Sequence, residues 1–281
     1  MSNTRHHLSE GLITFSMYAV LIAVSAFMLL PFVWMVSTSL KTPEQVFSVP
    51  VQLIPEHPTL INYQYLLQEK NLLRILLNTI FLAGVSTGLR LFFCSLGGFA
   101  FAKYKFPGRG FLFAFVLATM LIPGAVTLVP VYIIMRNLSL IDTLWALIIP
   151  GAANAFGIFF MRQYIMAIHD ELLDAARIDG ATEFAIYRRI IVPMITPGLI
   201  GIGLIFFMGA WNDYFGPLVY LKSPENFTLP LAIASFQGAS GLTNFNGQMA
   251  MAVISIIPLL IIFLIFQNRF VDGISAGAVK G

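Results

Sequence analysis

Long apolar stretches separated by short polar segments make up most of the chain. Five of them hold no charged residue and one holds only Arg90; they cover residues 11–36, 75–102, 111–128, 143–161, 195–210 and 248–266. A helix needs about 20 apolar residues to cross a hydrocarbon core about 30 Å thick. The pattern therefore predicts an all-α, polytopic membrane protein with six transmembrane helices, which form a single transmembrane domain over residues 1–281.

Glycine and proline occur inside several of these stretches, as at Gly97, Gly98, Pro123 and Pro150. Small residues let membrane helices approach closely, and proline removes a backbone donor and bends a helix. We therefore expect kinked, closely packed helices.

The basic residues between the stretches predict the orientation. Ten fall on one side of the predicted membrane: Arg5, Lys103, Lys105, Arg109, Arg162, Arg177, Arg188, Arg189, Arg269 and Lys280. Five fall on the other side: Lys41, Lys70, Arg74, Arg136 and Lys222. Since Lys and Arg accumulate in cytoplasmic loops, we expect both termini in the cytoplasm, residues 37–74 and 211–247 as outer loops, and residues 167–193 as a cytoplasmic loop.

Composition excludes several classes of protein. Hydrophobic residues make up 58% of the chain and charged residues only 10%, against about 25% charged in a soluble domain. The net charge of +3 comes without a basic block, so we expect no nucleic-acid partner. Cys94 is the single cysteine and the histidines do not cluster, so we expect no disulfide and no metal site.

The chain carries no sequence signal of an ATPase or a hydrolase. It has no GxxxxGK[ST] loop, so any ATP must bind to a partner. The GxSxG pattern at residues 84–88 lies within a transmembrane stretch, whereas a nucleophile elbow needs a strand before the serine. We therefore expect that the chain is not an enzyme and holds no cofactor itself.

Charges inside the membrane would indicate the driving force of transport. The six stretches contain no Asp, Glu or His, which argues against a proton relay. Arg90 has two interpretations: a side chain that reaches toward the interface, or a partner for anionic groups in a transport pathway.

The loop at residues 167–193 is predicted to form two short amphipathic helices. In the first, Asp170 is the expected N-cap, Glu171 and Asp174 place negative charge in the first turn, Arg177 places positive charge in the last, and Gly180 ends the helix in the left-handed conformation.

In the second helix, Thr182 is the expected cap and Pro193 the expected stop. Apolar residues recur at helical spacing in both helices: Leu172, Leu173, Ala176, Phe184, Tyr187 and Ile191. This face would lie either on the membrane or the chain's own bundle, or dock into a groove of another protein.

The segment from Asp174 to Ala181, DAARIDGA, resembles the "EAA" loop of ABC importer permeases, with Asp174 in place of the usual Glu. The resemblance implies the MetI-like permease fold and a coupling helix that inserts into the ATP-binding subunit. The coupling role then falls on Glu171, Asp174, Ala175, Ala176, Arg177, Asp179, Gly180 and Ala181.

Further segments resemble carbohydrate-importer permeases, above all the second permease of the maltose importer (MalG type). They are FAFAKYKFPGRG at residues 99–110, FMRQY at 160–164, WNDYFGPL at 211–218 and ISAGAVKG at 274–281. The resemblance implies that the tail residues Val279, Lys280 and Gly281 contact the ATPase subunits, and that residues 221–247 enter the solute-binding protein.

The implied function is half of the translocation pathway for a sugar or oligosaccharide in the prokaryotic cytoplasmic (inner) membrane. The implied partners are a second permease, two copies of an ATP-binding cassette subunit that bind ATP and Mg²⁺, an extracytoplasmic solute-binding protein, and the lipid bilayer. A glycerol-phosphate-like solute stays open because of Arg90, and the alternative function is an ATP-independent secondary transporter or channel.

Four residues are candidates for the substrate pathway: Trp211, Asn212, Tyr214 and Arg90. Aromatic faces and amides suit sugars, although aromatic residues at a membrane interface can also serve only as anchors.

Overall fold

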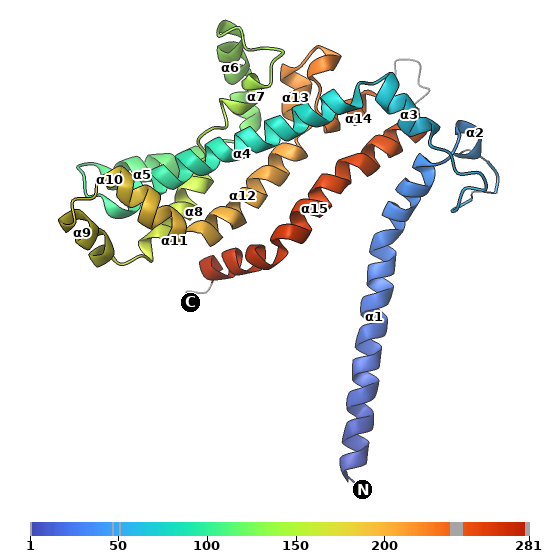
Figure 1. Ribbon diagram of the computed structural model, residues 1–281, viewed down its shortest axis with the longest axis horizontal. Coiled ribbons are helices and arrows are strands. Elements are labelled where there is room, and N and C mark those ends of the chain that lie inside the picture. The colour runs from blue at the N-terminus through green and yellow to red at the C-terminus, as the bar shows by residue number, and fades with distance from the viewer. Residues whose placement is uncertain (1, 47, 51, 237–243, 279–281) are drawn as a thin grey trace. The chain divides into compact units, whose positions relative to one another are not determined.

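The computed structural model describes residues 2–46, 48–50, 52–236 and 244–278. The chain divides into two compact units, residues 1–70 with 236–256 and residues 71–235 with 257–281. All regular elements in the described residues are helical (Figure 1).

The first unit contains α1 (Ser2–Ser39), α2 (Pro43–Val46), α3 (Ile61–Gln68) and the start of α15 (Phe245–Ala278). The described side chains of α1 are mostly exposed up to Val33, as expected of a helix that faces lipid or another chain. At the end of α1 the chain folds back on itself. Asn62 Nδ2 donates to Ser39 O at 2.8 Å and to Lys41 O at 2.9 Å, and the Lys41 ammonium, itself buried, lies 4.7 Å from the centre of the Trp34 ring.

The second unit is built around α4 (Leu72–Lys103), and the rest of α15 belongs to it. Its remaining elements are α5 (Arg109–Ala118), η1 (Thr119–Leu121), α6 (Gly124–Asn137), α7 (Trp145–Ile148), α8 (Ala155–Met166), α9 (Asp170–Ile178), α10 (Glu183–Ile186), η2 (Tyr187–Ile191), α11 (Val192–Met194), α12 (Thr196–Trp211), α13 (Phe215–Tyr220), η3 (Pro224–Asn226) and α14 (Leu229–Ser235). Helices α8 and α12 pack along α4, and α9 and α10 lie at its carboxyl end (Figure 1).

Three helical segments are long and apolar enough to cross a membrane singly: Thr14–Ser39, Leu72–Lys103 and Phe245–Gln267. Two bent pairs also qualify if each pair is one span. Arg109–Leu121 and Gly124–Asn137 meet at 100°, and Glu183–Met194 and Thr196–Trp211 meet at 79°.

The predicted span at residues 111–128 falls within the first bent pair, and the predicted span at residues 143–161 falls within none of these segments. Within residues 111–128, Ile122 is extended (φ −85°, ψ 114°) because a following proline, here Pro123, disfavours the helical conformation. Within residues 143–161, the chain leaves the helix between Ile148 and Ala155, around Pro150. Proline lacks the backbone donor that would continue the helix.

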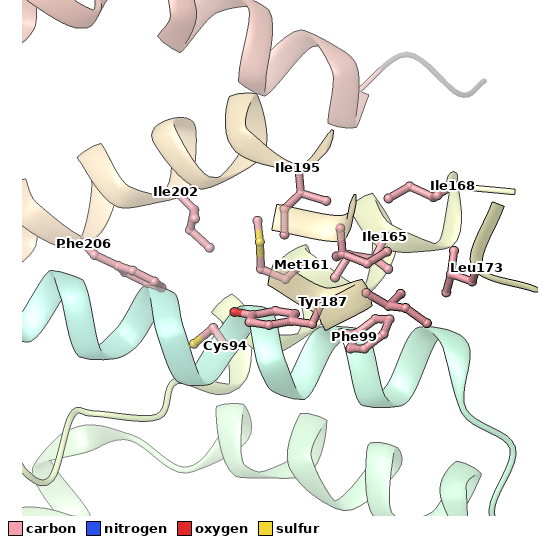
Figure 2. Packing of buried hydrophobic residues seen from close by; sticks show 12 residues of the cluster. Cys94, Phe99, Met161, Ile165, Ile168, Leu173, Tyr187, Ile195, Ile202 and Phe206 are labelled. Atoms are coloured by element: carbon pink, nitrogen blue, oxygen red, sulfur yellow. The ribbon is translucent and has the colours of Figure 1, made fainter. Parts of the chain in front are cut away.

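The core of this unit joins α4 and α8 to the segment from α9 to α12. Cys94 and Phe99 come from α4, and Met161 and Ile165 from α8. The other buried members are Ile168, Leu173, Ile186, Tyr187, Ile191, Ile195, Ile202 and Phe206. Figure 2 shows the Tyr187 ring beside the Phe99 ring of α4, with 5.8 Å between ring centres. The predicted loop helices are thus anchored in the same core as the long helices.

Candidate functional site

Helix α9 (Asp170–Ile178) is the first of the two predicted loop helices. The prediction that Asp170 is its N-cap is wrong. The N-cap is His169, whose side chain makes no capping hydrogen bond. The Asp170 carboxylate instead accepts a bond of 2.6 Å from Lys103 Nζ, at the end of α4. This hydrogen bond and the lysine charge lower the pKa of Asp170.

The turn after α9 has the predicted geometry. Gly180 has φ +81°, and the amide of Ala181 donates to Ala176 O at 2.9 Å, so the carbonyls at the end of the helix are satisfied. Thr182 Oγ1 accepts from the Ala185 amide at 3.3 Å and caps α10. The prediction that Pro193 stops the second helix is wrong: Pro193 lies inside α11, and the break comes at Ile195, just before α12.

The predicted apolar face divides between the core and the surface. Leu173 is 1% exposed and Tyr187 and Ile191 are buried with it. In contrast, Leu172 is 43%, Ile178 87% and Phe184 59% exposed. One side of the two helices therefore packs on the chain's own bundle, and the other side leaves apolar residues uncovered.

The predicted coupling residues are mostly on the surface. Glu171, Asp174, Ala175, Arg177, Asp179 and Gly180 are exposed, whereas Ala176 and Ala181 are half-buried against the core.

Arg177 links the two loop helices through ion pairs. Its Nη1 donates to Asp174 Oδ1 at 2.7 Å, and its Nε donates to Glu183 Oε1 at 2.9 Å. Hydrogen bonding to Glu183, and then to Asp174, raises the pKa of Arg177. The Tyr104 hydroxyl donates to the other oxygen of Glu183. Burial, followed by this bond and the charge of Glu183, raises the pKa of Tyr104 to about 12, so the hydroxyl keeps its proton at neutral pH.

From the sequence, Lys103 serves as a charge that indicates orientation, and Lys103 and Tyr104 belong to the segment 99–110 that resembles other permeases, but neither has a predicted partner. Both lie at the end of α4. Lys103 precedes its partner Asp170 by 67 positions, and Tyr104 precedes its partner Glu183 by 79 positions. No local pattern connects groups at that distance.

The substrate-pathway candidates lie in two places. Trp211 is the last residue of α12, and Asn212 and Tyr214 follow it. Trp211 is fully buried and stacks on Phe207 with 5.6 Å between ring centres. Asn212 is exposed and donates to Met208 O at 2.9 Å, and Tyr214 is 41% exposed.

Arg90, the fourth candidate, lies within α4. Its Nε donates to Gly151 O at 2.9 Å, and its guanidinium lies 5.7 Å from the centre of the Phe206 ring. The tail candidates Val279, Lys280 and Gly281 lie outside the described residues.

Asp142, which no sequence pattern indicates, binds the start of residues 221–227. Its carboxylate accepts from the amides of Lys222 at 2.8 Å and Ser223 at 2.9 Å, and also from Ser223 Oγ. Asn78 of α4 donates to Glu225 O at 2.9 Å and to Phe227 O at 3.1 Å. This stretch is thus attached both to α4 and to the turn before α7.

Known proteins resemble the chain over most of its length. The permease protein AraQ of the arabinooligosaccharides transport system of Bacillus subtilis (strain 168) is 33% identical over 95% of this chain and 98% of its own. The sulfoquinovosyl glycerol transport permease SmoH of Agrobacterium fabrum is 31% identical over 90% and 89%.

A crystal structure of a bacterial ABC transporter involved in the import of the acidic polysaccharide alginate contains a chain with the same fold. The TM-score is 0.81 at 27% identity, over 92% of this chain and 96% of that one. The sequence resemblance to carbohydrate-importer permeases is confirmed. Residues 95–276 match the family described as binding-protein-dependent transport system inner membrane component, and the chain belongs to this family of ABC importer permeases.

Proposed function

We propose that the chain forms half of the translocation pathway for an oligosaccharide and that α9 couples this pathway to ATP hydrolysis by a partner subunit. The observation that carries the proposal is the uncovered surface of α9, where Leu172 and Ile178 are exposed beside the carboxylates of Glu171 and Asp174. An amphipathic helix that leaves apolar residues uncovered suits insertion into a groove.

The bend before α12 supports a mechanical role for this helix. The segment Glu183–Met194 meets Thr196–Trp211 at 79°, and Ile186, Tyr187, Ile191 and Ile195 fix it in the core. A displacement of α9 is therefore passed on to packed helices rather than absorbed by a loose loop. In this proposal two ATPase subunits, which hold ATP and Mg²⁺, close and move α9, and the bundle opens toward the solute-binding protein.

The proposed orientation puts α9 and both termini in the cytoplasm, because the ten-to-five distribution of basic residues favours that side. The tail at Val279–Gly281 is proposed as a second contact with the ATPase subunits. The proposed assembly also contains a second permease subunit, which supplies the other half of the pathway.

The substrate class rests on the relatives, whose names specify arabinooligosaccharides and sulfoquinovosyl glycerol. Just after α12, Tyr214 exposes an aromatic ring. The exposed amide of Asn212 donates to Met208 O through its nitrogen, and its oxygen is an acceptor. Both groups suit sugar hydroxyls. We propose these two as pathway contacts ahead of Trp211, whose ring is buried.

Co-purification tests the proposal. The tagged chain is expressed with the neighbouring transport genes, and Leu172→Asp with Ile178→Asp is compared with the wild type. Both side chains are exposed, so the variant should fold. We expect the wild type to bring down a second permease and two ATPase subunits, and the variant to lose the ATPase subunits. Leu138→Asp, at a residue 57% exposed beyond the end of α6, is the matched control.

Uptake into proteoliposomes with the solute-binding protein tests the substrate. An arabinooligosaccharide should be imported with ATP hydrolysis, and glycerol phosphate should not compete with it. A wild-type chain that purifies alone and transports without ATP would support the ATP-independent transporter instead.

A further inference from the structure

Two consecutive residues at the end of α4 hold the two ends of α9. Lys103 is the last residue of α4 and Tyr104 is its C-cap. Lys103 Nζ donates to Ile168 O, just before α9, and to the carboxylate of Asp170, its first residue. The Lys103 side chain is only 5% exposed, so its ammonium is enclosed between α4 and the start of α9.

The other end of α9 is held through a relay. The Tyr104 hydroxyl donates to the Glu183 carboxylate, which also accepts from Arg177 Nε at 2.9 Å and Nη2 at 3.3 Å. Arg177 is in the last turn of α9 and also binds Asp174 on the same helix.

Contacts with neighbouring residues of α4 and with Arg109 hold Tyr104 in place. The amide of Tyr104 donates to Ala100 O at 3.2 Å, and Arg109 Nη1 donates to Tyr104 O at 3.0 Å. The Tyr104 ring packs edge-on against the buried Phe99, with 5.3 Å between centres. Lys103 and Tyr104 are thus continuous with α4, along which α8 and α12 pack.

Between these polar attachments, α9 itself contributes one fully buried side chain, that of Leu173, to the core (Figure 2). With so little apolar contact, α9 would be free to tilt or slide on the bundle if the polar attachments were absent. Hydrogen bonds of charged groups contribute more than neutral ones and fix direction as well.

We propose that Lys103 and Tyr104 form a two-point clamp that transmits the movement of α9 directly to α4, and that they are positioning residues for the coupling of ATP hydrolysis to transport. The clamp rests on the proposed role of α9. It adds a second route into the bundle, beside the covalent route through α10 and α11 to α12.

The test compares Lys103→Met and Tyr104→Phe with the wild type in the reconstituted transporter with its ATPase subunits and solute-binding protein. Uptake and ATP hydrolysis are measured in the same vesicles. We expect the variants to assemble and hydrolyse ATP, with the number of molecules imported per ATP reduced by roughly 2- to 30-fold, the range for changes within a coupling network.

Two matched controls separate the clamp from a general loss of charge or hydroxyl. Lys105→Met removes an exposed lysine two residues away, and Tyr18→Phe removes a hydroxyl from an exposed position of α1. Both should leave the ratio of uptake to hydrolysis unchanged. Asp170→Asn combined with Lys103→Met should lower the ratio no further than Lys103→Met alone, because the two side chains act through one bond.

The outcomes separate this inference from the proposed function. If the wild type couples uptake to ATP and both variants keep the same ratio, the clamp is wrong and the proposed function stands. If the wild type itself binds no ATPase subunit, the proposed function fails first. Should Lys103→Met not assemble, Tyr104→Phe decides, because it removes a single oxygen, and an unchanged ratio in that variant overturns the clamp.

Discussion

Arg90 Nε, in α4, donates a hydrogen bond of 2.9 Å to the main-chain oxygen of Gly151 in another segment of the chain. Gly151 lies in the non-helical stretch between α7 and α8, where carbonyl groups lose their helical partners. In a membrane such groups cost free energy unless another donor reaches them. The arrangement accounts for an arginine within an apolar helix without requiring a substrate.

Replacement of Arg90 should therefore lower stability first. We expect Arg90→Met to reduce the free energy of unfolding by about 1.5–3 kcal/mol, the contribution of a hydrogen bond to a charged group. Thermal unfolding in detergent measures the change, with Arg188→Met, at an exposed arginine, as control. If stability is unchanged and only the KM for an anionic solute rises, the pathway interpretation of Arg90 is the better one.

Two neighbouring glycines of α4 should respond very differently to alanine. A Cβ on Gly98 would lie 2.7 Å from Met161 Cβ and 2.8 Å from the main-chain nitrogen of Arg162, whereas a Cβ on Gly97 would lie 3.4 Å from its nearest neighbour, the side-chain atom Ile158 Cγ1. Main chain cannot move aside as a side chain can. We expect Gly98→Ala to destabilise the protein by about 1–3 kcal/mol and Gly97→Ala to be nearly neutral, as measured by thermal unfolding. Equal effects would contradict the close approach of α4 and α8.

Gly180 should be sensitive because of its backbone conformation alone. Its φ is +81° and a Cβ there would meet no atom within 4 Å, so the expected penalty of Gly180→Ala is the left-handed strain of about 1–2 kcal/mol. We expect less ATP-coupled uptake with Gly180→Ala and a milder loss with Gly180→Asn, since asparagine tolerates this conformation.

Gly110→Ala, in the first turn of α5 with open space and an ordinary φ, is the control for Gly180. Full coupling in Gly180→Ala would show that the turn geometry does not matter for function.

Asp142 should keep residues 221–227 in place over the physiological pH range. Burial raises the pKa of Asp142, but the hydrogen bonds from Ser223, Lys222 and Asn226 outweigh it and lower the pKa from 3.8 to about 2. A carboxylate with a lowered pKa stabilises the folded form fully above about pH 4, and this contribution is lost as the pH falls through about 2. Protease cleavage in this segment should therefore not differ between pH 5 and pH 8.

The variant Asp142→Asn should increase that cleavage roughly fivefold, for a loss of about 1 kcal/mol, and should reduce uptake that depends on the solute-binding protein. Glu225→Gln serves as the control, because Asn78 binds the main-chain oxygen of Glu225 and not its carboxylate. Equal cleavage of Asp142→Asn and the wild type would argue against the anchor.

The sequence by itself determined the helical class, most of the long apolar segments, and the local form of the loop around Gly180. These features depend on interactions within a few residues: the period of apolar positions, the left-handed glycine and the Thr182 cap. Local interactions did not determine the roles of Asp170, predicted as an N-cap, and Pro193, predicted as a helix stop. Asp170 is drawn to Lys103, 67 positions away in the chain, and Pro193 sits near the start of a helix segment, where its missing donor costs little.

Only the tertiary structure decided which side chains meet between helices. Gly97 and Gly98 look alike in the sequence, and no sequence pattern indicates the partners of Lys103, Asp142 and Arg90. Their partners depend on the rotation and register with which α4 packs against α8 and the loop segments. That register is set by the combined fit of many side chains in one core, and no short stretch of sequence contains it.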